Sequence, residues 1–98
     1  MREYILLMHS DTVSAESGSD WDGYLGRLHA SGCFRGGSVI AAGQSFRKDG
    51  PPGPVATHIS GFIRIEAADL EAARAFLPGN PTFEAGGTVE IRELPITS

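Results

Sequence analysis

The residues that say most about the fold are GFIRIEAADLEAARAFLPGNPTFEAGGTVEIREL, positions 61–94. Apolar and polar residues alternate along 61–67 and again along 88–94, and both runs are rich in β-branched types, which predicts two strands. Between them Asp69 is a good helix N-cap, and the apolar spacing after it predicts a helix that ends at Pro78-Gly79. A strand, a helix and a strand make half of a small α+β domain.

The first half of the chain predicts a similar succession of elements. Residues 2–9 are apolar at nearly every interior position, which favours a central strand, and the polar residues 10–17 indicate a loop. Ser19-Asp20-Trp21-Asp22 resembles a capping box, and it opens a helix that Gly32 ends. Residues 38–43, extending towards Phe46, predict the second strand.

A proline-rich segment separates this strand from the third one. Residues 48–54, KDGPPGP, contain three prolines without a backbone donor, so we expect the tip of a hairpin there. The complete order β-α-β-β-α-β is ferredoxin-like: a four-stranded antiparallel sheet with two helices on one face. A chain of 98 residues is short for two cores, so we expect one domain over residues 1–98.

The other face of such a sheet has no helix to cover it. We expect Phe62 there, together with part of the first strand (Tyr4, Leu6 or Met8). An apolar face of this kind favours pairing with a second copy, which predicts a homodimer. The residues expected to face the core are Trp21, Leu25 and Leu28 of the first helix and Ile63, Ile65, Val89 and Ile91 of the sheet.

Composition narrows the classes of partner and compartment. The formal net charge is −4, with the basic residues scattered, which argues against a nucleic-acid surface. The single cysteine, Cys33, has no internal partner for a disulfide, so we expect a reducing compartment. The apolar run at residues 4–8 is too short for a signal peptide or a membrane span. We therefore expect a cytoplasmic protein without a membrane partner.

Several short segments resemble YCII-related domains. They are Tyr4-Ile5-Leu6-Leu7-Met8, the Asp49-Gly50-Pro51 turn, Gly61-Phe62 with 66–73, Asn80-Pro81 and 86–92. The branch marked by an Asp-Gly-Pro-Phe turn is the most similar, although Pro52 stands where that branch has Phe. The resemblance implies a ferredoxin-like subunit that dimerises sheet to sheet and encloses a cleft, in a branch mostly without an established reaction.

The resemblance also implies where an acid–base pair would stand. In some members, a His on the first helix and an Asp before the last strand are thought to remove chloride from a chlorinated aromatic. Alignment on the helix and on Pro81, Glu84, Ala85 and Gly86 puts Tyr24 and Asn80 at these positions. Tyrosine has a reference pKa near ~10 and asparagine does not titrate, so this pair cannot exchange protons near neutral pH as His and Asp do.

The chain has three histidines, and the sequence favours one of them as a ligand or base. His9 ends the first strand, beside the expected cleft, with Asp11 close enough in sequence to orient it. His29 and His58 are weaker candidates. No pair has the spacing of a helical zinc site, and Cys33 has no sulfur partner, so we predict neither a metal nor another cofactor.

Three further residues have a structural and a functional interpretation. Arg64 and Arg92 can lie near one another across the central strand and bind a carboxylate ligand, or they can pair with acids such as Glu66 and Glu90. Trp21 can stack on a ligand or form part of the core or the cleft wall. The expected ligand-binding set is therefore His9, Trp21, Tyr24, Arg64 and Asn80, with His9, Tyr24 and Asn80 as the catalytic candidates.

Two functions remain open, and the sequence does not decide whether the protein is an enzyme. The first is a protein that binds or converts a small molecule in the cleft. The second is a non-catalytic regulatory domain, since relatives are often encoded beside alternative sigma factors. A deep apolar pocket with convergent polar groups favours the first, and a filled cleft with an exposed apolar patch elsewhere favours the second.

Overall fold

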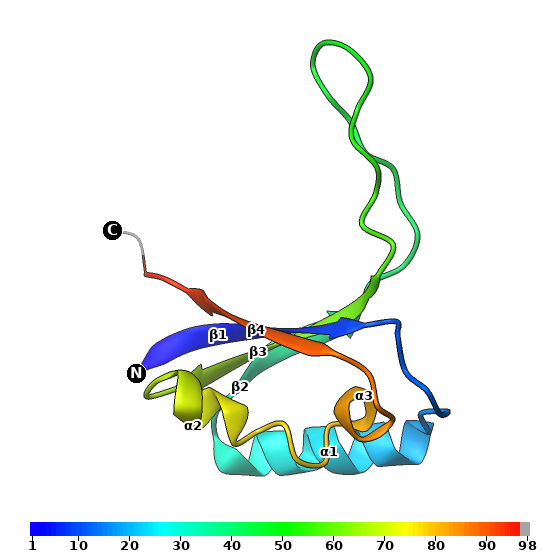
Figure 1. Ribbon diagram of the computed structural model, residues 1–98. Helices are drawn as coiled ribbons and strands as arrows, with labels where there is room; N and C mark the ends of the chain where they lie inside the picture. Colours follow the sequence, from blue (N-terminus) through cyan, green and yellow to red (C-terminus); the bar gives the residue numbers. More distant parts are fainter. Residues whose placement is uncertain (97–98) are drawn as a thin grey trace.

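The computed structural model describes residues 1–96, which form a four-stranded sheet with three helices packed on one side (Figure 1). The order of strands is β2-β3-β1-β4, and every neighbouring pair is antiparallel, as the ferredoxin-like prediction requires. No helix in these residues is long and apolar enough to cross a membrane. The elements are β1 (Arg2–His9), α1 (Gly18–Ser31), β2 (Phe34–Val39), β3 (Ile59–Ala67), α2 (Leu70–Arg74), α3 (Pro81–Glu84) and β4 (Val89–Leu94).

Strand β1 is central, as predicted, but its two faces are the reverse of those expected. Leu6 lies opposite both Ile63 and Ile91, and residues directly opposite in a sheet point to the same face. Tyr4, Leu6 and Met8 are therefore buried against the helices, and placing any of them on the open face was wrong. The open face instead receives Ile5 and Leu7, which are half-buried.

Helix α1 begins two residues earlier than the capping box suggested. Ser17 is the N-cap, and its hydroxyl oxygen accepts a hydrogen bond from the Asp20 amide at 3.1 Å. The predicted stop at Gly32 is confirmed, with this glycine in the left-handed conformation at φ 76°. The buried residues of the helix are Tyr24 and Leu28, whereas Trp21 and Leu25 only border the core.

Strand β2 lies at Phe34–Val39, not at residues 38–43. Its glycines hid it: Gly36 adopts φ 112°, and the pairing with β3 shifts between Phe34 and Gly37. The apolar residues after Val39 leave the sheet and begin a long connection to β3, residues 40–58, which we call the arm. The hairpin connection between β2 and β3 is thus as predicted, but it is longer.

The segment before β4 contains a helix that the sequence pattern missed. The Asp69 cap of α2 is confirmed, with its carboxylate accepting from the Ala72 amide at 2.8 Å, but α2 ends at Arg74 and turns follow. Asn80 then caps the short helix α3, which has Pro81 in its first turn. An Asn followed by Pro is a recognised helix start, so the signal was present.

Candidate functional site

Helix α1 presents three stripes of residues to three different surroundings. Tyr24 and Leu28 point into the core. On one side, the stripe Gly18, Trp21, Asp22 and Leu25 lines an apolar cavity. On the other side, the stripe Ser19, Asp20, Gly23 and Arg27 lines a polar groove. The helical period alone separates these stripes, so one short helix forms a wall of both hollows.

The apolar cavity has a volume of about 570 Å³ and lies between α1 and the edge of the sheet formed by β2 and β3. Its floor lacks side chains at Gly37 and Gly61, which lie on the helix-side face of the sheet. A Cβ at Gly61 would stand 3.1 Å from the Ser38 carbonyl oxygen and 3.4 Å from Met8 Cε. A Cβ at Gly37 would stand 2.5 Å from the Phe62 carbonyl oxygen, so glycine at these two positions allows the backbones of β2 and β3 to lie close together under the cavity.

Glu16 is the acidic group with hydrogen bonds at this cavity. One carboxylate oxygen accepts a hydrogen bond from the Trp21 indole at 2.8 Å, and the other accepts from the Thr82 hydroxyl at 3.2 Å. Glu16, Trp21 and Thr82 all line the cavity, and Thr82 is buried. The sequence analysis missed Glu16 and Thr82 because a loop glutamate and a threonine 66 positions away show no shared pattern.

The structure brings the two predicted pair positions, Tyr24 and Asn80, together in the core. The Tyr24 hydroxyl donates to the Phe76 carbonyl oxygen at 2.7 Å, and Asn80 Oδ1 accepts from the Phe83 amide at 3.0 Å. Burial raises the pKa of Tyr24, and the nearby Asn80 amide and Arg27 charge oppose that rise. Within residues 1–96 Asn80 Nδ2 completes no hydrogen bond, so it acts on Tyr24 as a nearby dipole.

His9 and Arg64 lie away from this pair, on the open face of the sheet. His9 Nε2 is 3.0 Å from a Glu90 oxygen, and the His58 ring packs edge-on against His9 with 5.0 Å between centroids. Arg64 is held by Glu3, with Nε 2.6 Å from the carboxylate. The five predicted site residues therefore do not form one cleft within one chain.

The sequence suggested that Asp11 orients His9, but in the structure Asp11 pairs with another residue. Both of its carboxylate oxygens accept hydrogen bonds from Thr88, one from the amide and one from the hydroxyl, each at 2.7 Å. These bonds lower the pKa of Asp11. Glu90 pairs with the His9 imidazole instead, because Glu90 lies on β4, next to β1, and on the same face of the sheet as His9.

The third histidine is remote from both of the others. His29 packs its ring against Phe34, with 4.5 Å between the centroids. Over residues 1–96, no three histidine, cysteine, aspartate or glutamate side chains lie close enough to hold a metal ion.

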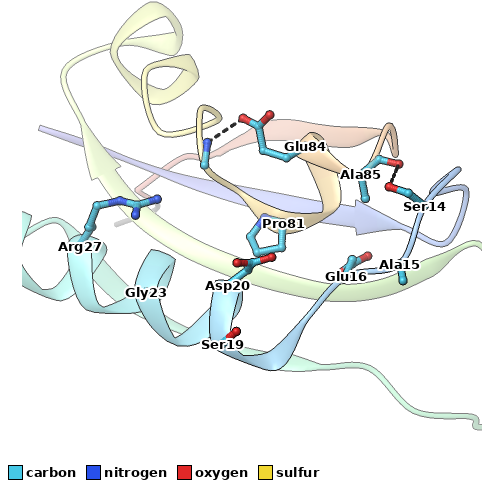
Figure 2. A pocket seen from close by; sticks show the side chains of 11 residues that line it. Ser14, Ala15, Glu16, Ser19, Asp20, Gly23, Arg27, Pro81, Glu84 and Ala85 are labelled. Carbon is cyan, nitrogen blue, oxygen red and sulfur yellow. Dashed lines mark hydrogen bonds between the residues drawn. The ribbon is translucent and has the colours of Figure 1, made fainter.

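The polar groove on the other side of α1 has a volume of about 450 Å³. Figure 2 shows its walls: Asp20 and Arg27 project from α1, Pro81 of α3 lies beside Asp20, and Glu84 of α3 turns toward Gly79. The Glu84 carboxylate accepts from the Gly79 amide at 2.9 Å, and its neighbours on the groove are mostly exposed. A wet groove whose acids outnumber its single arginine offers little apolar area to a ligand, so the apolar cavity is the better candidate site.

Comparison with known proteins identifies both a family and a structural neighbour. Residues 9–95 match the YCII-related domain. The structure is similar to 5-chloro-2-hydroxyhydroquinone dehydrochlorinase from Burkholderia phenoliruptrix AC1100, solved in complex with 2,5-dihydroxybenzoquinone. The TM-score is 0.54 at 15% sequence identity, over 95% of this chain and 93% of the other. A likeness at this identity establishes the fold alone. A search of curated proteins finds no match.

Proposed function

This chain belongs to the YCII-related family, and from that starting point we propose that it binds a small, flat and largely apolar molecule in the cavity between α1 and the β2–β3 edge. The observation that carries the proposal is an apolar cavity whose wall holds one indole and a carboxylate, Glu16, that is hydrogen-bonded to it. Its volume of about 570 Å³ lies within the range of roughly 300–1,000 Å³ typical of ligand sites.

The lining indicates the chemistry of the ligand. Trp21, Leu25 and Phe34 supply apolar and aromatic surface, on which a planar ring gains both burial and favourable ring–ring contact. Glu16 accepts hydrogen bonds and carries no donor when ionised, so it favours a ligand with a hydroxyl group and disfavours an anion. A neutral phenol has both properties.

The structural neighbour is consistent with a flat ligand of this kind, since 2,5-dihydroxybenzoquinone, the ligand in its complex, is a hydroxylated six-carbon ring. We carry over the class and not the reaction. The resemblance puts Tyr24 and Asn80 where some relatives have an acid–base pair, and the Tyr24 hydroxyl already donates to the Phe76 carbonyl oxygen. The proposal is therefore ligand binding without the proton exchange of the catalytic relatives.

We propose further that the working unit is a cytoplasmic homodimer paired through the open faces of the two sheets. The half-buried residues Ile5, Leu7 and Phe62 on this face support it. An apolar sheet face without helices gains stability when a second copy excludes water from it.

The alternative function, a regulatory domain that works with a transcription (sigma) factor, has less support. A filled cleft would favour it, and the cavity beside α1 is not filled by side chains. Saturable binding of a small molecule to the protein alone distinguishes the first function from this alternative.

A matched pair of glycine variants on α1 tests the proposed site. Gly18 lines the cavity and Gly26 lines neither hollow, and a Cβ at either position meets nothing within 4 Å. Calorimetric titration with 2-naphthol, a neutral planar phenol, should show saturable binding. Gly18→Leu should weaken it at least about tenfold by occupying the cavity mouth, and Gly26→Leu should leave it unchanged.

Two results count against the site. One is no saturable heat from 2-naphthol at any concentration tested, and the other is equal affinity in the Gly18→Leu and Gly26→Leu variants. Naphthalene-2-sulfonate serves as the anionic control, and it should bind more weakly than 2-naphthol because Glu16 repels it.

A further inference from the structure

The arm, residues 40–58, is a long segment with few hydrogen bonds to the rest of the chain. Within residues 1–96, no residue from 41 to 57 makes a backbone–backbone hydrogen bond. Phe46 has 86% of its surface exposed and Val55 has 38%. Connections longer than about 12–15 residues without secondary structure are uncommon in small domains, and those that exist usually are linkers or serve a function.

The root of the arm fixes its direction. The Ser10 amide donates to the His58 carbonyl oxygen at 2.8 Å, and the Ile40 amide donates to the Ser60 carbonyl oxygen at 3.0 Å. The edge-on packing of His9 and His58 adds a contact at the same place. From this root the arm rises on the side of the sheet that faces away from the helices (Figure 1).

The arm therefore stands beside the open face, and the two surfaces meet at the root. The centre of this face is apolar, with Ile5, Leu7 and Phe62 side by side on β1 and β3. Its charged groups balance, because three glutamates and three arginines share the face and each arginine lies within 4 Å of a glutamate. These pairs are Glu3 with Arg64, Glu66 with Arg35 and Glu90 with Arg92.

A neutral face with an apolar centre suits a second copy of itself better than a strongly charged partner. In a two-fold pair the same patch meets itself, so its net charge must be close to zero for the two copies not to repel each other. A copy seated on this face would lie next to the arm, and the symmetry would place its own arm beside the first chain.

We propose that the arm is a clasp that grips a second copy of this chain, with Phe46 as its apolar anchor. The inference rests on the proposed homodimer and adds the part of the chain that holds it together. The arm contacts the neighbouring copy in two ways. Backbone groups of residues 41–57 without a backbone partner in residues 1–96 form hydrogen bonds with it, and the exposed Phe46 packs against it. Phe46 of each copy becomes buried in the dimer, so its apolar contribution to the free energy of association is made twice.

The test compares the dimer dissociation constant of four proteins by sedimentation velocity over a range of concentrations. They are the natural chain, a variant with residues 42–56 replaced by Asn-Gly, Phe46→Asp, and the control Val13→Asp. Val13 is as exposed as Phe46, at 85%, but lies before α1 and not on the arm. Circular dichroism checks that each variant keeps its fold.

The natural chain and Val13→Asp should dimerise alike, whereas Phe46→Asp should raise the dissociation constant by about 100-fold or more. The arm-shortened variant should be a folded monomer at micromolar concentration. Unchanged dimerisation of both arm variants overturns the clasp and leaves the homodimer standing. A natural chain that stays monomeric at high concentration overturns both, and neither result bears on the binding of 2-naphthol.

Discussion

At the scale of single residues, Tyr24 is a core residue in this structure, although the sequence made it a catalytic candidate. Its ring lies in the core, its hydroxyl donates to the Phe76 carbonyl, and burial raises its pKa. A buried hydroxyl with a filled hydrogen bond and a raised pKa is a poor proton acceptor near neutral pH. Both of the following predictions depend on this environment.

The first prediction concerns stability at high pH. An unfolded tyrosine ionises near pH 10.0, while the folded Tyr24 holds its proton to higher pH. The native state then binds more protons than the unfolded state, so the free energy of unfolding should fall as the pH rises above about 10. Urea unfolding between pH 8 and 11 should show a shallower fall for Tyr24→Phe.

At pH 8 the same substitution should cost about 1 kcal/mol, because the Phe76 carbonyl loses its donor. The other tyrosine is present in both proteins and cancels in the comparison. Parallel pH curves for the two proteins would mean that Tyr24 ionises as readily in the folded chain as in the unfolded one.

The second prediction concerns the missing reaction. The natural chain should not release chloride from a chlorinated hydroxyquinol, since neither Tyr24 nor Asn80 exchanges protons near pH 7. The double variant Tyr24→His, Asn80→Asp restores both titratable groups, and we expect it to release chloride faster than the natural chain. Ion chromatography of released chloride measures both. Rapid release by the natural chain would show that another base serves.

At the scale of secondary-structure elements, the sequence predicts the strands and helices that have a periodic pattern of apolar residues. It misplaces the strand that contains neighbouring glycines. The apolar run of β1, the alternating runs of β3 and β4 and the caps at Asp69 and Gly32 were found because their signals are local. Strand β2 was misplaced because Gly36 and Gly37 have no side-chain pattern, yet they pair with β3 through a bulge. The low strand propensity of glycine is outweighed there by backbone pairing with β3.

The site was less predictable than the fold for the same physical reason. Trp21 was identified, and it lines the cavity. Glu16 and Thr82 meet only because α3 folds back onto the start of α1, and part of the cavity floor is formed by Gly37 and Gly61, which carry no side chain. Neither a long-range contact nor an empty space leaves a periodic signal in one sequence.

Helix α1 supplies a prediction at this scale. A Cβ meets nothing within 4 Å at either Gly26 or Gly32, but only Gly32 has a positive φ, 76°. Gly26→Ala should therefore stabilise the protein by about 0.5–1 kcal/mol, and Gly32→Ala should destabilise it by about 1 kcal/mol. Chemical unfolding measures both. Equal effects of the two substitutions would contradict the conformational explanation.

At the scale of the whole molecule, the fold divides two tasks between the two faces of the sheet. The covered face carries the core and, at the β2–β3 edge, the apolar cavity. The open face carries balanced charges around an apolar centre and stands beside the arm. Strand β3 contributes to both, because its residues alternate between the two faces.

The homodimer can be tested at the centre of the open face. Leu7→Glu would bury an unpaired charge beside Glu90 in each half of the pair, which should raise the dissociation constant by about 100-fold or more. Leu70→Glu makes the same change on α2, where the side chain is 49% exposed, and should leave association unchanged. Sedimentation equilibrium compares the two, and equal constants would rule out the open face as the interface.

The central claim is that a small phenol occupies the apolar cavity, and Trp21 allows the most direct measurement of it. This is the chain's one tryptophan, so its indole N–H appears as a single resonance in a ¹H–¹⁵N spectrum, and it donates to Glu16 at the cavity. Titration with 2-naphthol should move this resonance saturably, together with the amides of Leu25 and Gly61. Movement confined to Ser19, Asp20 and Arg27 of the polar groove, or no movement at all, would contradict the account.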